Sequence, residues 1–327
     1  MDNTQKVLKL ISTSPDYVSG EAIATKLQLS RTAIWKIVKH LQEDGFPISS
    51  KRHAGYYYTD TGKLNTFIIQ QHLKKELRTQ LSFEVHEKIS STSTRAKELA
   101  VHGSQTSPTV ILANQQLNGY GRYGRNFDSP GTGIYLSILL KNPSTSLNPG
   151  LLTTATALAL TLAIEKKLAV FPKIKWVNDI VLNDKKVIGI LTEAVADIES
   201  QTISQLVVGI GVNYLTDPTS FPIELQKRAG SLRQAVLAQK VSRNIFIANI
   251  LNEFFTLYAH YEDGAFLDEY RKRSLMLGKE VTLVQGNRKF SGIVKTIDDQ
   301  GRLVLHDGTR FSSGEVTKTR LVTEKKR

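Results

Sequence analysis

The sequence predicts an α+β protein built from three segments. Residues 1–63 carry helical periodicity and end in a short hairpin pattern, residues 64–277 alternate strand-like and helical runs, and residues 278–327 hold short β-like runs separated by turn residues. The 327 residues allow two or three domains, each with its own core. Hydrophobic residues make up 40% and charged residues 22%, which is ordinary for a globular chain and argues against disorder.

The composition excludes several kinds of chemistry. The absence of cysteine excludes disulfides and thiol nucleophiles and favours a reducing, cytoplasmic compartment. The seven histidines never form an HxxxH or HExxH pattern, so we expect no protein-built transition-metal site. The start of the chain lacks a secretory pattern, and the most apolar stretch, residues 151–164, is too short and too polar to span a bilayer. We therefore expect no membrane partner.

The net charge of +13 favours attraction to polyanions, but the excess is spread along the chain. The three segments carry +3, +5 and +5. Charge alone therefore does not say which segment meets nucleic acid, and motifs must decide that question.

The first segment predicts three short helices, over residues 5–12, 19–27 and 30–45. Ser19 and Ser30 are suited to cap the second and third helices. In the third helix Ile34, Ile37, Val38 and Leu41 recur at i, i+3, i+4 and i+7 and predict one buried stripe. The second and third helices are joined by a short turn, which is the helix-turn-helix pattern.

The outer face of the third helix is polar and basic, and it is the predicted DNA-reading face: Arg31, Thr32, Trp35, Lys36 and Lys39. Residues 48–58 follow as a short hairpin with Lys51, Arg52 and His53 near its tip, which indicates a wing. The alternative is a small helical interaction domain with a solvated basic face. The wing at this distance favours a winged helix-turn-helix that binds DNA.

The second segment predicts strands near residues 110–114, 134–140 and 206–212, and helices near 95–101, 151–168 and 244–261. This is a mixed α/β pattern, and the segment is large enough to bind a ligand or to be catalytic. In the third segment, runs at 281–284, 290–296 and 303–306 alternate with turn signals, so we expect a small β-barrel of about 50 residues.

Gly119, Gly121 and Gly124 spell GxGxxG, the dinucleotide fingerprint, which requires a strand before it and a helix after it. Here a polar stretch and another strand-like run follow, so we predict a glycine-rich loop between two strands. Within the loop, Arg122 and Arg125 are spaced so that both guanidiniums could reach one anion.

Residues 175–179, KWVND, precede a predicted turn at Asn183 and Asp184, and Lys186 follows, ahead of GILTE. A lysine, an amide and a carboxylate near strands could serve the phosphates of a nucleotide, a Mg²⁺ ion and a proton transfer. For any single residue here, the ordinary explanation is a turn or a surface charge.

Two further motifs are weaker alone. Residues 209–213, GIGVN, read as a buried strand that ends on Asn213, whose amide could read an adenine edge. Residues 90–94, SSTST, precede a helix, where helix capping is the ordinary explanation and hydroxyl contacts to a ligand are the alternative.

In this order, SSTS, GYGRYGR, KWVND, Lys186 with GILTE, and GIGVN strongly resemble the biotin protein ligase family. With the winged helix-turn-helix, the chain looks like the bifunctional bacterial form, which is also the biotin operon repressor. The resemblance covers all three segments. It implies a ligase domain related to class II synthetase-like folds and an SH3-like barrel from Gly278 onward.

The resemblance implies a two-step reaction. ATP and biotin form biotinyl-5′-AMP and pyrophosphate, and the acyl group then passes to a lysine of the biotin carboxyl carrier domain of a carboxylase. In the first step a carboxylate attacks the α-phosphate, so fixed cations are needed, and Arg122, Arg125, Lys186 and Mg²⁺ can provide them. Asp179 is the nearest candidate in sequence to take a proton from the incoming ammonium. No protein nucleophile is required.

The resemblance also implies ligand sets. Those for biotin are Ser91, Thr92, Gln116, Gly119, Tyr120, Lys186 and Gly189. Those for ATP are Gly121, Arg122, Gly124, Arg125, Asn178 and Asn213. The loop would close over the adenylate and favour a homodimer, and the dimer would bind operator DNA.

Three residues depart from the family pattern. Tyr120 replaces the first loop arginine and removes a cation from the biotin side, so biotin affinity or loop ordering should differ. Val177 replaces a proline, and Ser93 replaces an asparagine, which should leave activity intact. Two alternatives stay open: a transcription factor that senses a ligand without turnover, and a lipoate or octanoate ligase.

Overall fold

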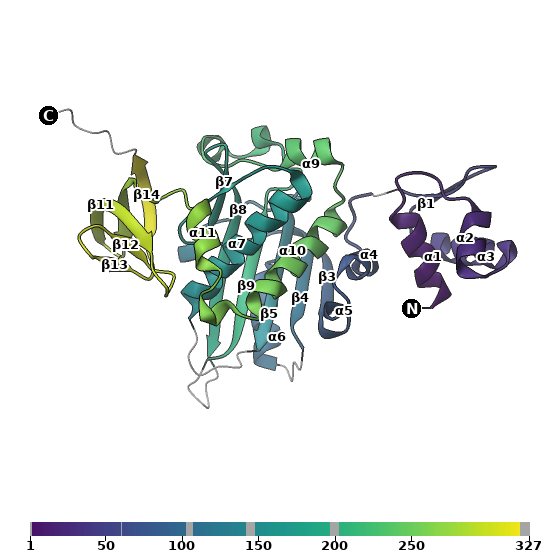
Figure 1. The fold of residues 1–327 in the computed structure, drawn as a ribbon, viewed down its shortest axis with the longest axis horizontal. Helices are drawn as coiled ribbons and strands as arrows, with labels where there is room; N and C mark the ends of the chain where they lie inside the picture. The colour runs from purple at the N-terminus through teal and green to yellow at the C-terminus, as the bar shows by residue number, and fades with distance from the viewer. Residues whose placement is uncertain (1, 60, 103–106, 142–147, 197–202, 321–327) are drawn as a thin grey trace. The chain divides into compact units, whose positions relative to one another are not determined.

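The computed structural model describes residues 2–59, 61–102, 107–141, 148–196 and 203–320. The chain divides into two compact units, Met1–His72 and Leu73–Arg327 (Figure 1). The predicted boundaries after residues 63 and 277 stay predictions.

The first unit contains the three predicted helices, α1 (Asn3–Ser12), α2 (Gly20–Leu27) and α3 (Arg31–Glu43). The caps are those that the sequence indicates. Ser19 Oγ accepts a hydrogen bond from the Ala22 N–H at 3.0 Å, and Ser30 Oγ accepts one from the Ala33 N–H at 3.1 Å. Each cap satisfies an amide that the first helical turn would otherwise leave without a partner.

The core of this unit is apolar, and it leaves the outer face of α3 in solvent. Val7, Ile11, Ile23, Ile34 and Val38 are buried together. A short hairpin follows, made of β1 (Ile48–Lys51) and β2 (Gly55–Tyr58), and α4 (Thr66–His72) closes the unit. The winged helix-turn-helix fold predicted from the sequence is confirmed.

The second unit is built on a seven-stranded sheet in the order β3-β4-β5-β9-β8-β7-β6. Its strands are β3 (Ser82–Ile89), β4 (Thr109–Gln116), β5 (Ile134–Lys141), β6 (Lys173–Lys175), β7 (Asp179–Leu182), β8 (Lys185–Ala196) and β9 (Ile203–Val212). β3 and β4 pair in parallel, and the other neighbours are antiparallel. The sheet therefore holds side by side β8 and β9, which carry the GILTE and GIGVN motifs, and β4, which the glycine-rich motif follows, lies in the same layer.

Helices cover the sheet. Figure 1 shows α7 (Pro149–Leu168), α10 (Arg243–Tyr258) and α11 (Leu267–Arg273) in front of it. α6 (Thr92–His102) packs on β4, β5 and β9, with Ala96 against Ile111, Leu139 and Val207. Among the described residues, no helix combines the length and apolar character needed to cross a membrane.

The threonines of α7 explain how so polar a stretch can be buried. Thr156 Oγ1 donates to the Leu152 carbonyl and Thr161 Oγ1 to the Ala157 carbonyl, both at 2.8 Å. Each hydroxyl is satisfied by its own helix, which removes the cost of burying it.

Some elements differ from the sequence prediction. The helix expected over residues 244–261 ends at Tyr258, and Tyr261–Asp263 forms a separate 3₁₀ turn. The short helices α4, α5 (Leu77–Gln80), α8 (Ile223–Gln226), α9 (Arg233–Gln239) and α11 were not predicted. Helices of one or two turns carry too few residues for a periodic pattern, and tertiary packing sustains them.

The C-terminal segment forms a five-stranded sheet in the order β13-β12-β11-β10-β14. Its strands are β10 (Glu280–Gln285), β11 (Arg288–Ile297), β12 (Leu303–Leu305), β13 (Arg310–Phe311) and β14 (Glu315–Arg320). Side chains from the turn between β6 and β7 and from α11 donate hydrogen bonds to its backbone. Trp176 Nε1 donates to the Gly301 carbonyl at 2.9 Å, and Arg271 Nε donates to the Ile297 carbonyl at 2.7 Å.

Candidate functional site

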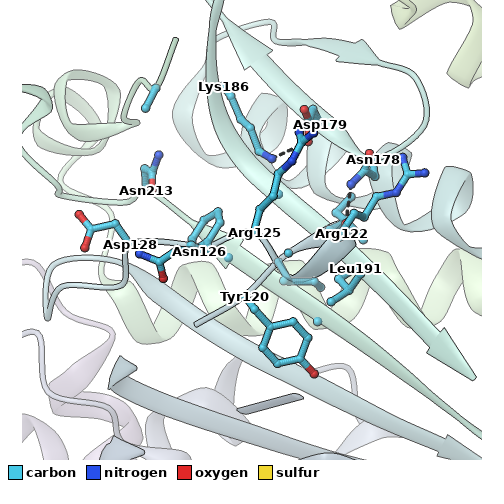
Figure 2. A pocket seen from close by; sticks show the side chains of 18 of the residues that line it. Tyr120, Arg122, Arg125, Asn126, Asp128, Asn178, Asp179, Lys186, Leu191 and Asn213 are labelled. Atoms are coloured by element: carbon cyan, nitrogen blue, oxygen red, sulfur yellow. Dashed lines mark hydrogen bonds and ion pairs between the residues drawn. The ribbon is translucent and has the colours of Figure 1, made fainter. Parts of the chain in front are cut away.

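The predicted ligand residues meet at one cavity of about 630 Å³. It lies among the start of α6, the glycine loop, the turn before β7, the adjacent ends of β8 and β9, and the start of β14 (Figure 2). All the predicted biotin and ATP residues line this cavity except Gly119 and Gly124. Five motifs spread over more than 120 positions are thus brought to one place.

At one end of the cavity, the SSTS motif is tied to Gln116. The Thr92 N–H and hydroxyl both donate to Gln116 Oε1, at 2.8 and 3.0 Å, and Gln116 Nε2 donates to Ser129 Oγ at 3.1 Å. Ser91 Oγ accepts from the Thr94 N–H at 3.4 Å, so the capping interpretation is observed for this serine. These contacts fix short polar side chains at the wall of the cavity.

Ser93, which departs from the family pattern, is buried and lines the same wall of the cavity. Its hydroxyl lies 3.0 Å from that of Ser137. Gly209 makes room for it, because a Cβ there would lie 2.5 Å from Ser93 Oγ. The serine is therefore accommodated without an unpaired hydroxyl.

The glycine-rich segment is a loop between β4 and β5, as predicted, and only a 3₁₀ turn, Arg122–Gly124, forms within it. The loop is closed by two backbone bonds of 2.8 Å, from the Gly121 N–H to the Arg125 carbonyl and from the Phe127 N–H to the Gly119 carbonyl. Gly124 has φ +69°, which favours glycine. Gly119 sits in the base of the loop, where a Cβ would lie 2.5 Å from Ser129 Oγ.

The two loop arginines are held by the C-terminal segment. Arg122 Nη1 donates to the Gly314 carbonyl at 2.9 Å. Arg125 donates from both Nη atoms to the two carboxylate oxygens of Glu315, each at 2.6 Å. Hydrogen bonds from Arg125, opposed by burial, hold the pKa of the Glu315 carboxyl below its ordinary value. Both guanidiniums line the cavity, and the prediction that they could reach one anion concerns a ligand and stays a prediction.

Lys186 and Asp179 form an ion pair at the cavity. Their Nζ and Oδ1 atoms are 2.7 Å apart, and the side chains are 38% and 24% exposed. They lie on adjacent strands, β8 and β7, joined by the predicted turn, where Asn183 and Asp184 both have positive φ. Figure 2 shows both groups with the Arg125 guanidinium near them. Three cations and a carboxylate thus surround one end of the cavity.

The two asparagines expected to bind nucleotide have structural bonds. Asn178 Nδ2 donates to the Ile190 carbonyl at 2.7 Å, and Asn213 Nδ2 donates to the Gly230 carbonyl at 2.8 Å. Both side chains line the cavity while their amide nitrogens hold neighbouring backbone.

Sequence reasoning missed several lining residues, among them Phe127, Arg228 and Glu315. Phe127 packs against Gly211, where a Cβ would lie 2.5 Å from the ring, and against Gly189 on the neighbouring strand. A glycine inside a strand often marks the close approach of another group. Gly211 in the GIGVN motif could therefore have predicted that an aromatic ring packs against this strand. Glu315 had no such signal, because its partner lies 190 positions away.

The predicted DNA-contacting side chains are all exposed on the first unit, five on α3 and two at the hairpin tip. Trp35 is 52% exposed, and Lys39 Nζ lies 5.3 Å from the centroid of its ring. α3 is the second helix of the helix-turn-helix motif. An exposed tryptophan with basic neighbours on this helix fits a surface that contacts the major groove of DNA.

Three family models match the chain. The Biotin/lipoate A/B protein ligase family model matches residues 85–213, an HTH domain model matches residues 3–57, and the Biotin protein ligase C terminal domain model matches residues 276–318. The order is the one expected from the sequence.

Among curated proteins, the bifunctional ligase/repressor BirA of Bacillus subtilis is 34% identical over 295 residues, which is 89% of each chain. The protein of the same name from Escherichia coli is 27% identical over 93% of each. Among solved structures, the biotin protein ligase of Aquifex aeolicus in complex with biotin and ATP has 26% identity and a TM-score of 0.57, covering 73% of this chain and 99% of that one. The chain therefore belongs to the biotin protein ligase family, in the bifunctional form that joins the ligase to a helix-turn-helix repressor domain.

Proposed function

We propose that this chain forms biotinyl-5′-AMP from biotin and ATP and transfers the biotinyl group to a lysine of a biotin carboxyl carrier domain. We also propose that it represses biotin genes in response to biotin. The observation that carries the enzymatic half is the single cavity, which gathers the biotin-side hydroxyls, the loop arginines and Lys186. The curated relatives are ligases by name, which favours turnover over ligand sensing alone.

The first step brings a biotin carboxylate against the α-phosphate of ATP. Two anions repel, so the barrier falls only where fixed cations already face the place where charge gathers. Arg122, Arg125 and Lys186 line that end of the cavity. We assign Arg122 and Lys186 to the reacting phosphate and carboxylate, and Arg125 to the nucleotide phosphates.

Mg²⁺ is proposed as the companion of ATP. The described residues hold no cluster of three or more histidine or acidic side chains suited to a metal. Mg²⁺ usually binds one or two carboxylates plus substrate phosphates and keeps several waters, so Asp179 at the cavity wall fits such a shared site. When bound, the ion would neutralise charge on the phosphates.

In the second step, the incoming lysine must lose a proton before its nitrogen attacks the mixed anhydride. Asp179 is the carboxylate next to the reacting cations, and its present partner is Lys186. When Lys186 turns to the ligand, Asp179 is left able to accept that proton. The nitrogen forms the amide bond, and AMP leaves with its phosphate.

The biotin ring is assigned to the polar wall of Ser91, Thr92 and Gln116, with Tyr120 and Gly189 beside it. These groups offer donors and acceptors of the kind that a cyclic urea needs. The adenylate is assigned to Asn178, Asn213 and the loop. The glycines at 119, 121 and 124 let that loop lie against the ligand and exclude the water that would hydrolyse it.

Operator DNA is assigned to the exposed face of α3 and the wing. Two-fold operators are bound by helix-turn-helix dimers, so we propose a homodimer that forms when the adenylate is bound. Reciprocal linkage then ties ligand occupancy to DNA affinity.

One assay tests the enzymatic proposal. Purified protein is incubated with biotin, ATP, Mg²⁺ and a carrier domain, and we expect pyrophosphate release and a mass gain of one biotinyl group on a single carrier lysine. Biotin binding without pyrophosphate release would instead support the ligand-sensing alternative. Turnover with lipoate or octanoate in place of biotin would support the other one.

A further inference from the structure

Three hydroxyl groups at the polar wall of the cavity form a short chain of hydrogen bonds. Ser137 Oγ donates to Thr92 Oγ1 at 2.8 Å, and Ser93 Oγ lies 3.0 Å from Ser137 Oγ. The Thr92 hydroxyl in turn donates to Gln116 Oε1 at 3.0 Å. Thr92, Ser93 and Gln116 line the cavity, whereas Ser137, on β5, is fully buried and does not. The hydroxyls of Ser93, Ser137 and Thr92 are called here the hydroxyl relay.

The direction of each hydrogen bond in the relay follows from one backbone amide. The Thr92 N–H can only donate, and it lies 2.8 Å from a side-chain atom of Gln116, so that atom is the carbonyl oxygen Oε1. The Thr92 hydroxyl faces the same oxygen and must give its single hydrogen to it. Ser137 is then left to donate to Thr92, and Ser93 to donate to Ser137.

The relay leaves the Thr92 hydroxyl only one way to meet a ligand. A hydroxyl has one hydrogen and two lone pairs. Gln116 takes the hydrogen and Ser137 occupies one lone pair, so Thr92 keeps a single acceptor. A cyclic urea presents ring N–H groups, which need such an acceptor. A ring oxygen or a plain acyl chain has no hydrogen to give to it.

The strands around the relay leave space for it. Ser137 on β5 pairs with Gly209 on β9, where a Cβ would lie 2.5 Å from Ser93 Oγ and 3.7 Å from Ser137 Oγ. Glycine at this position of the GIGVN motif therefore keeps room for two hydroxyls in a buried place. A buried hydroxyl without a partner is costly, so each member of the relay fixes the next. The relay and Gln116 belong to α6, β4 and β5, outside the glycine loop.

We propose that Ser137 is a positioning residue that sets the specificity of the biotin site, because it holds Thr92 as a hydrogen-bond acceptor for a ring N–H of the ligand. Ser93 is the outer member of the relay and acts through Ser137. The proposal rests on the proposed function, since it concerns how the wall assigned to biotin selects its ligand. It adds a buried residue that lies in none of the sequence motifs.

The test measures the affinity of the full chain for matched ligands by titration calorimetry without ATP. The ligands are biotin and its two cyclic carbamate analogues, in each of which one ring N–H is replaced by oxygen. In wild type we expect one carbamate to bind more weakly than biotin, because its ring oxygen faces the Thr92 acceptor. In Ser137→Ala biotin should bind about three- to tenfold more weakly, the loss typical of one hydrogen bond, while the affinity for that carbamate should not change. The preference for biotin over the carbamate should therefore shrink.

Two further variants separate specificity from general stability. Ser93→Ala should weaken biotin binding less than Ser137→Ala does, because Ser137 keeps its own hydrogen to donate. Thr156→Val is the matched control, since it also removes a buried hydroxyl, on α7, from a residue that does not line the cavity. It should lower the free energy of unfolding in urea and leave the affinity for biotin as in wild type.

Kinetics supply the second readout. In Ser137→Ala KM for biotin in pyrophosphate release should rise with little change in kcat, as expected when a group acts on binding alone. If Ser137→Ala keeps the full preference for biotin over both carbamates, or binds all three ligands more weakly by the same factor, the proposal is wrong. If wild type binds none of the three ligands, the assignment of the wall to biotin fails, and the specificity proposal fails with it. That outcome is distinct from a wild type that prefers biotin and a variant that keeps the preference.

Discussion

At the scale of single residues, the two cations assigned to the reacting groups are held in different ways. Arg122 is fixed by one hydrogen bond to the backbone of Gly314 and lies over the Tyr123 ring, with 5.3 Å between the guanidinium carbon and the ring centroid. Lys186 instead lies on a strand of the sheet, paired with Asp179. Both cations are assigned to the reacting groups, and the loop residue is in addition the one suited to retain the adenylate.

Replacing Arg122 by glycine should release the adenylate faster. A charge-assisted contact is worth about 1.5–3 kcal/mol, so we expect escape to quicken by roughly ten- to a hundredfold and nearby lysines to be labelled indiscriminately. The measurement is the decay of bound biotinyl-5′-AMP together with mass spectrometry of bystander proteins. Arg122→Lys keeps the charge, so its rate of adenylate release should lie between those of wild type and Arg122→Gly. A glycine variant that retains the adenylate as wild type does would make the loop arginine merely structural.

Lys186→Ala should impair the first step more than Arg122→Gly does. It removes a fixed cation where charge develops, a change that typically costs about a hundredfold or more in rate. Pyrophosphate release under single-turnover conditions measures it. Lys185→Ala is the control, since Lys185 is the adjacent lysine and does not line the cavity. Equal rates for Lys186→Ala and wild type would refute the assigned role.

At the scale of elements, local patterns predicted what local forces determine. The caps at Ser19 and Ser30 and the apolar stripe of α3 lie within a few residues of what they stabilise, so sequence alone located the helices. The loop between β4 and β5 was predicted for the same reason, because the residues after Gly124 could not start a helix.

Long-range pairings were not predictable in that way. Glu315 reaches Arg125 only because the C-terminal sheet docks on the ligase domain, and no pattern near either residue reports that docking. The ion pair of Lys97 and Glu193 was also missed. In the sequence each is an ordinary surface charge, and only the packing of α6 beside β8 brings the two together. The candidate site was therefore predicted where motifs carry it and missed where tertiary contacts do.

The Arg125–Glu315 pair should couple the loop to the C-terminal sheet. In a double-mutant cycle with Arg125→Gln and Glu315→Gln, we expect a coupling of about 0.5–1 kcal/mol in the free energy of unfolding at pH 7, limited by solvent exposure. Urea unfolding of the four proteins measures it. A coupling of zero at pH 7 would show that the pair adds nothing.

The same pair should fail in acid. Arg125 depresses the pKa of folded Glu315 below its ordinary 4.5, so the pair stabilises the protein above that pH and loses its effect as pH falls through the lower folded value. The coupling measured at pH 7 should therefore shrink below about pH 4.5, whereas a coupling that is constant down to pH 3 would contradict the ionic explanation.

At the scale of the whole molecule, two compact units carry the two halves of the function. The first unit, Met1–His72, includes α4. A protein that begins after residue 63 would keep α4 but lose the core of the first unit, against which α4 packs. A protein that starts at Leu73 separates the units at the observed boundary. It is the proper control for any effect assigned to DNA.

Operator binding should depend on biotin and ATP. The first segment carries only +3, so one copy should bind DNA weakly, and two copies joined through the ligase units should bind a two-fold site. If ordering of the loop favours the dimer, ligand and DNA share one coupling free energy, typically about 1–3 kcal/mol, or roughly five- to 150-fold in affinity. Fluorescence anisotropy with operator DNA, with and without biotin plus ATP, measures it, and added carrier domain should release the DNA by draining the adenylate. If the affinity for operator DNA does not change with biotin and ATP, or if the protein starting at Leu73 still binds the DNA, the regulatory half of the proposal is wrong. The enzymatic half would not be affected.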